Sequence, residues 1–219
     1  MNERIRDRMR PPVGSAQCAG SPAGAALRAE AARSLAHVVF DGMSLRRALE
    51  EANPRIADPR DRALLAASLF AASRWWLRFD AAVAALTATP LPAKAREVRA
   101  LLVLGLVQIA VLEMPAYAVV AACVDAVRAL GQPRYAGLAN AVLRRFLRER
   151  DALDAPLDGD PVTRDAHPRW LIDAIGRDWG PLADAVLAAN NREAALTLRV
   201  NRRRGTRSGL LARLQAAAV

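Results

Sequence analysis

The spacing of apolar residues constrains this chain most, because from residue 25 onward they recur every three or four positions, as on one face of a helix. The first such stripe consists of Leu27, Ala31, Leu35 and Val38. A longer stripe of the same period covers residues 65–86. Alanine and leucine are abundant, whereas aromatic residues, which favour strands, make up only 5% of the chain. The pattern therefore predicts a mostly helical protein.

Residues that begin and end helices divide this pattern into segments. Ser44 is placed to cap a short helix that closes before Pro54, because the residue before a proline avoids helical geometry. Asp58 is placed as the cap of the next helix, and the proline that follows it occupies the first helical position. We expect two nearly continuous helices over residues 59–86, with Asp80 as a candidate cap of the second.

The most apolar stretch follows a proline-rich break at residues 89–92. Residues 93–113 are apolar on all sides from Leu101 onward, which predicts a central buried helix. The run is too short for a membrane span, and its continuation is interrupted by Glu113 and Pro115, so we expect no membrane segment. Two further helices are predicted over residues 116–130 and 135–150.

Composition shifts along the chain suggest its domain organisation. We expect a disordered basic tail (1–22), a helical domain (23–150), a linker (151–166) and the start of a second unit (167–219). The tail is equally consistent with a loose RNA contact, a solvated arm or a misassigned reading-frame start. In the second unit two helices precede a strand at 196–200. The predicted fold is thus an all-α bundle followed by a small mixed α/β junction segment.

The charge of the chain indicates a polyanionic partner. Its formal net charge is +10, and 31 of its 32 basic residues are arginines, the exception being Lys94. Basic side chains placed against phosphates release condensed counterions, so nucleic acid is the leading partner class. The arginine bias is also what a GC-rich genome produces. Two basic concentrations, residues 144–150 and 192–213, nevertheless favour RNA contact over simple solvation, and the second holds seven arginines and one glutamate.

Residues suited to catalysis, cofactor binding or metal binding are not evident. Glycines that could cradle a phosphate need a strand before them and a helix after them, and this sequence has no such turn. Cys18 and Cys123 are too few for a disulfide framework or a zinc site, which is typical of a reduced cytoplasmic protein. Cys123, His37 and His167 are each interpreted as structural residues. We therefore predict no catalytic, cofactor-binding or metal-binding residue here, and no secretory signal.

The helical part contains five short motifs: Arg28-x-x-Ala31-x-x-x-Leu35-x-x-Val38, Asp61-Arg62-Ala63-Leu64-Leu65, Gly105-Leu106-Val107-Gln108, Met114-Pro115-x-x-Ala118 and Asn140-Ala141-Val142-Leu143-Arg144-Arg145. Together these motifs resemble the NusB-like RNA-binding domain.

Three motifs of the second unit resemble the junction region of RsmB (Sun/Fmu)-type small-subunit rRNA cytosine-5 methyltransferases. They are His167-Pro168-Arg169-Trp170-Leu171, Ala189-Asn190-Asn191 and Leu198-Arg199-Val200-Asn201. The chain departs from that pattern in having Glu193-Ala194-Ala195 where the family usually has Pro-Pro, and Ala72-Ser73 where a glycine often precedes Arg74.

The resemblance implies methylation of a cytosine C5 in rRNA by S-adenosylmethionine, with a cysteine thiolate that adds to C6. We expect the chain to be truncated, with the nucleophile and the cofactor loop after Val219, so this chain alone is predicted to be inactive. By similarity, the candidate contacts to small-subunit rRNA are Arg28, Arg33, Arg144, Arg145, Arg148, Arg199 and Asn201. Arg199 and Asn201 are equally suited to fixing a strand at the junction.

Two other functions stay open at this point. A free-standing NusB-like transcription antitermination factor would end near residue 150, and the motifs beyond that position favour the methyltransferase family instead. A helical interaction scaffold would not bind RNA, or would bind it without dependence on salt.

Overall fold

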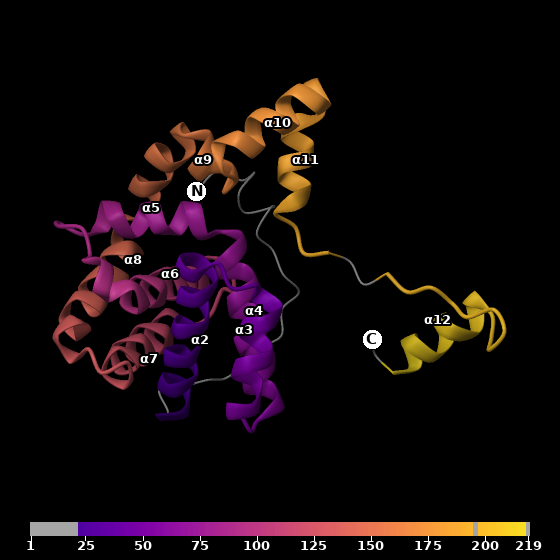
Figure 1. Ribbon diagram of the computed structural model, residues 1–219, viewed down its shortest axis with the longest axis horizontal. Coiled ribbons are helices and arrows are strands. Elements are labelled where there is room, and N and C mark those ends of the chain that lie inside the picture. Colours follow the sequence, from indigo (N-terminus) through magenta and orange to yellow (C-terminus); the bar gives the residue numbers. More distant parts are fainter. Residues whose placement is uncertain (1–21, 195–196, 218–219) are drawn as a thin grey trace.

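The computed structural model describes residues 22–194 and 197–217, and regular structure within them is helical (Figure 1). The first part of the chain forms α2 (Pro22–Asp41), α3 (Leu45–Ala52), α4 (Pro59–Arg74), α5 (Trp76–Leu86), α6 (Arg96–Ala110), α7 (Ala116–Ala129) and α8 (Ala136–Gly159). The remainder forms α9 (Pro161–Asp165), α10 (Arg169–Trp179), α11 (Ala183–Asn190) and α12 (Arg207–Ala216). Short 3-10 turns precede α6, α8 and α11, at Ala93–Ala95, Pro133–Tyr135 and Gly180–Leu182, and another, Asn53–Arg55, follows α3.

Helix α6 is the centre of the bundle, as the apolar stretch from Leu101 onward predicts. Every residue from Ala100 to Ala110 is buried. Helices α2, α4, α5, α7 and α8 all contact it and surround it (Figure 1). At Gly105 the side chains of two neighbouring helices come so close that an added Cβ would lie 2.8 Å from Cδ2 of Leu143 and 3.2 Å from Sγ of Cys123. The glycine of the Gly-Leu-Val-Gln motif therefore sets how closely α7 and α8 approach α6.

Local capping residues begin the helices where the sequence predicts. The Ser44 hydroxyl accepts a hydrogen bond from the backbone N–H of Arg47, and the Asp58 carboxylate accepts one from Arg60. The break between α4 and α5, however, falls at Trp75 rather than at Asp80. Trp75 is buried, and Asp80 is instead bound by the guanidinium of Arg99. The position of the break is thus fixed by packing, not by a polar cap.

The stretch expected to be a linker is helical. Residues 151–159 continue α8, and residues 161–165 form α9. The aspartates that made this stretch look like a linker include Asp154 and Asp158, one helical turn apart, and both bind Arg78 of α5. This pairing holds the end of α8 against the bundle. Where the domain boundaries themselves lie remains a prediction.

The strand expected at residues 196–200 does not form in the described part of the chain. Residues 197–200 have no regular structure, and residues 195 and 196 lie outside the described ranges, as does all but the last residue of the expected tail. A strand needs a neighbouring strand for its backbone hydrogen bonds, and residues 22–194 and 197–217 provide none. The junction segment is therefore helical rather than mixed α/β where it can be described. In the same ranges, no helix combines the length and the apolar character that crossing a membrane requires.

Candidate nucleic-acid interface

Two arginines of α8 project from the bundle. Helix α8 buries Ala139, Val142, Leu143 and Phe146, so the opposite face, which carries Arg144 and Arg148, is exposed. The Nε of Arg144 donates to the side-chain oxygen of Asn140 at 2.9 Å, which directs the guanidinium along the helix. Arg144 and Arg148 are four residues apart and therefore neighbours on one helical face. They form a pair of cations that RNA phosphates can reach.

Arg145 has a more structural environment. Its Nε donates to the Glu149 carboxylate at 2.8 Å, and its Nη1 donates to the carbonyl of Leu86 at 3.2 Å. The guanidinium thus binds the last carbonyl of α5 and is half-buried there. Arg145 ties α8 to α5, and only part of its charge faces solvent.

Arg33 occupies a different place, on α2. Its Nη2 donates to the carbonyl of Ala129, the last residue of α7, at 3.2 Å, and its Nη1 lies 3.4 Å from the Glu30 carboxylate. About 40% of the side chain is exposed. Arg33 thus contacts the C-terminal end of α7, whereas Arg145 contacts the C-terminal end of a different helix, α5.

Arg28 lies in the interior, with only 1% of its surface exposed. Its Nε donates to the side-chain oxygen of Gln108 at 2.8 Å, and the Gln108 amide donates to the Ser68 hydroxyl at 3.0 Å. This buried chain of hydrogen bonds joins α2, α6 and α4. Arg28 faces protein on all sides, so we leave it out of the proposed RNA surface.

Arg199 and Asn201 lie together in the segment before α12. Both line an open hollow with Arg202, Arg203 and Arg207, and the side-chain oxygen of Asn201 accepts a hydrogen bond from the backbone N–H of Arg203 at 3.0 Å. Residues 198–207 are exposed except for Val200, which is partly buried. The segment lies away from the bundle (Figure 1). It concentrates positive charge without a packed scaffold.

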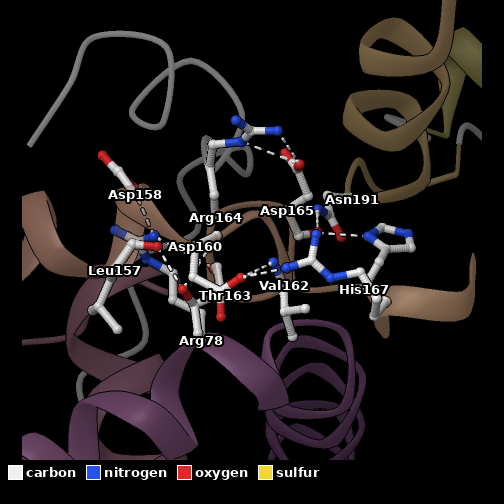
Figure 2. Close-up of polar contacts among 11 residues, drawn as sticks. Arg78, Leu157, Asp158, Asp160, Val162, Thr163, Arg164, Asp165, His167 and Asn191 are labelled. Carbon is white, nitrogen blue, oxygen red and sulfur yellow. Dashed lines mark hydrogen bonds and ion pairs between the residues drawn. The ribbon is translucent and has the colours of Figure 1, made fainter. Parts of the chain in front are cut away.

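The junction motifs meet in one hydrogen-bonded unit. The ring Nδ1 of His167 donates to the carbonyl of Asp165 at 2.5 Å, and the Asn191 amide donates to the same carbonyl at 2.6 Å (Figure 2). The Asn190 amide lies 3.4 Å from the other ring nitrogen of His167. These contacts hold the start of α10 against the end of α11, which explains in structural terms why His167 and the Asn-Asn pair occur together.

Arg78 is an important residue that the sequence did not single out. It is 2% exposed, and it donates to Asp154 and Asp158 at 2.8 Å each (Figure 2 shows the Asp158 contact). A third contact, at 3.5 Å, reaches the carbonyl of Thr163 in α9. The only available signal was the four-residue spacing of the two aspartates, which predicts a shared helical face but not their partner.

Cys123 is fully enclosed by the bundle. Burial raises the pKa of its thiol to about 11, although the nearby Arg28 guanidinium acts in the opposite direction. The thiol is therefore protonated at neutral pH, as expected of a structural cysteine. Among the described residues there is no group of three or more His, Cys, Asp or Glu side chains arranged to hold a metal ion.

Two protein-family models match successive regions of the chain. Residues 25–148 match the model described as "NusB family". Residues 167–219 match a second model, described as "Methyltr_RsmF/B-like, ferredoxin-like domain".

Individual relatives span both regions. Over 194 residues the chain is 43% identical to the protein named ribosomal RNA small subunit methyltransferase B of Xanthomonas campestris pv. campestris. The aligned region covers 88% of this chain and 42% of that protein. It is 45% identical to the protein of that name from Xylella fastidiosa strain 9a5c, covering 85% of this chain and 43% of the relative. For the Pseudomonas putida protein the identity is 40%, over 88% of this chain and 44% of the relative. The chain thus spans less than half the length of these relatives.

Proposed function

Because this chain belongs to the NusB family and continues into a region similar to RsmF/B-type methyltransferases, we propose that it is the RNA-binding part of an S-adenosylmethionine-dependent rRNA cytosine-C5 methyltransferase. Its partner would be small-subunit rRNA. The observation that carries this proposal is the joint match, in one chain, of residues 25–148 and 167–219 to these two families. The relatives that share both regions are named for methylation of small-subunit rRNA.

The surface supports RNA binding at three places. Arg144 and Arg148 present two exposed cations on a rigid helix, and Arg33 adds a partly exposed one on α2. The segment with Arg199 and Asn201 adds an exposed, strongly basic stretch. Such guanidinium groups fork onto phosphates or stack on unpaired bases. Arg145 contributes mainly by holding α8 in place.

The described residues do not fit the methyl donor. A binding site for S-adenosylmethionine needs a glycine turn between a strand and a helix, and the described ranges are helical throughout their regular structure. We therefore assign no residue of this chain to the cofactor, and the methyl transfer step would belong to a catalytic domain outside these 219 residues.

A binding experiment tests the proposal. Fluorescently labelled fragments of small-subunit rRNA are titrated with the chain, and transfer RNA serves as the competitor. We expect at least one rRNA fragment to bind in the presence of excess competitor, with an affinity that falls linearly as the logarithm of salt concentration rises. Equal displacement of every fragment by transfer RNA would contradict recognition of small-subunit rRNA.

Adding a transcript leader RNA to this titration separates the proposal from an antitermination factor. Such a factor would prefer a transcript leader RNA over the rRNA fragments. The match of residues 167–219 to a methyltransferase region favours the rRNA fragments instead.

A further inference from the structure

A pocket of about 410 Å³ opens where α2 ends and α6 begins. It is lined by Phe40, Leu91, Pro92, Ala93, Arg96 and Arg99. None of these residues belongs to the arginine sets described above. The volume is near the lower limit of pockets that hold small molecules, so it suits a single compact group rather than a helix of another protein.

The ring of Phe40 is held firmly while part of it stays exposed. It packs edge-to-face against Trp76, with ring centroids 5.7 Å apart, and it is 39% exposed. The Arg99 guanidinium lies 6.0 Å from the ring centroid and is fixed there by two hydrogen bonds to Asp80. A ring restrained in this way loses little freedom when a second flat group stacks on it.

Charged side chains of both signs surround the opening. Arg96 begins α6, and neither α6 nor the preceding turn Ala93–Ala95 has a side-chain N-cap, so the positive end of the helix dipole is open to an anion. Lys94 is exposed in the same turn. One carboxylate, that of Glu97, also lies in the first turn of α6, close to this end of the helix dipole.

Two of the nearby carboxylates, those of Asp41 and Asp80, are bound to cations. Asp41 lies 2.6 Å from Nη1 of Arg96 and 2.8 Å from Nδ1 of His37, and Asp80 is bound by Arg99. These contacts also hold the pKa of Asp41 below its usual value, with the His37 hydrogen bond as the largest cause. The pocket therefore combines an exposed aromatic ring, aliphatic walls and a helix start that favours anions.

We propose that this pocket binds one unpaired RNA nucleotide, with the base stacked on Phe40 and the phosphate near Arg96 and the start of α6. A nucleotide offers the flat ring and the anion together, whereas an acidic side chain offers only the anion, and the net charge of +10 suits an anionic ligand. This inference rests on the proposed RNA-binding function and names one site that would recognise unpaired RNA.

The test compares the full chain with two phenylalanine variants. Phe40→Leu keeps an apolar side chain but removes the stacking ring, and Phe70→Leu is the matched control because Phe70 is 51% exposed on α4, outside the pocket lining. Affinity is measured by fluorescence anisotropy for a short single-stranded RNA and for a duplex RNA with the same number of phosphates. We expect Phe40→Leu to weaken single-strand binding by about tenfold, since stacking is worth about 1–3 kcal/mol per base, and to leave duplex binding unchanged.

Crosslinking tests whether RNA contacts this pocket, and a second variant tests the role of Arg96. RNA carrying 4-thiouridine, irradiated in complex with the chain, should crosslink to a peptide that contains Phe40 or residues 91–96. Arg96→Gln should weaken single-strand binding and flatten its salt dependence by about one contact. Unchanged single-strand affinity in both variants, or a crosslink confined to other peptides, would overturn the pocket while leaving the proposed function intact. Failure of the unaltered chain to bind either RNA would overturn both.

Discussion

The Nε of Arg28 donates a 2.8 Å hydrogen bond to the side-chain oxygen of Gln108, a residue 80 positions later in the chain. Both residues are buried, and both lie within the region that matches the NusB family. Because Gln108 also donates to Ser68, one buried side chain connects three helices of the bundle. The arginine that a sequence reader would place on the RNA surface is thus part of what holds the bundle together.

This contact makes the two residues energetically coupled. Gln108→Leu removes the acceptor of the buried Arg28 Nε, and we expect a loss of about 1–3 kcal/mol in the free energy of unfolding. Arg28→Met combined with Gln108→Leu should cost less than the sum of the single changes, because an apolar pair replaces a polar one. Urea denaturation measures all three variants. Strictly additive losses would show that the two side chains act independently.

Arg78 is predicted to be the main attachment of the α8 end to the bundle. Arg78→Met leaves Asp154 and Asp158 without their buried cation, and we expect a loss of about 3 kcal/mol. Arg78→Lys should recover only part of it, because an ammonium cannot fork to two carboxylates as a guanidinium does. Hydrogen exchange should show faster exchange in residues 151–165 for both variants. Unchanged exchange there would contradict this role.

A Gly→Ala substitution should lower the stability of the fold at Gly105 and raise it at Gly137. Gly105→Ala places a methyl group against Leu143 and Cys123 in the packed core, and we expect a loss of about 1–3 kcal/mol. Gly137→Ala in α8 meets no atom within 4 Å, so the better helix former should raise stability by up to about 1 kcal/mol. Thermal unfolding of the two variants measures whether each substitution lowers or raises the melting temperature. A neutral Gly105→Ala would mean that α7 and α8 can move away from α6.

The buried thiol of Cys123 predicts a pH dependence of stability. Its folded-state pKa of about 11 lies above the ordinary value of 9.0, so the stability from keeping it protonated is complete below about pH 9 and is lost as the pH rises through 11. Relative to Cys123→Ala, the chain should lose about 2–3 kcal/mol across that window. The difference between the two urea titrations isolates this group from other residues that titrate there. A constant difference from pH 8 to pH 11 would contradict the burial argument.

Features set by neighbouring residues were predictable from the sequence, and features set by distant contacts were not. Ser44 and Asp58 cap their helices through bonds two or three residues away, so the predicted starts were right. The exposure of Arg144 and Arg148 also follows from the helical period, because the same period buries Val142 and Phe146.

The structure departs from the sequence pattern where a side chain contacts a partner far along the chain. Arg28 looks like any surface arginine until its partner on α6 is known, and the aspartates at 154 and 158 look like linker residues until Arg78 is placed beside them. The alternation at residues 196–200 suits a strand, but a strand forms only with a neighbour, and sequence pattern does not provide one.

The salt dependence of RNA binding tests the central claim most directly. The variant Arg144→Gln with Arg148→Gln is compared with Arg46→Gln with Arg47→Gln, which removes two exposed arginines from α3, each paired with a glutamate one turn away. If α8 contacts RNA phosphates, the first variant should bind small-subunit rRNA more weakly, and the slope of log affinity against log salt should fall by about 1.5, at about 0.7–0.9 per lost contact. The α3 variant should keep the original slope. Equal slopes for the unaltered chain and both variants would contradict an RNA interface on α8.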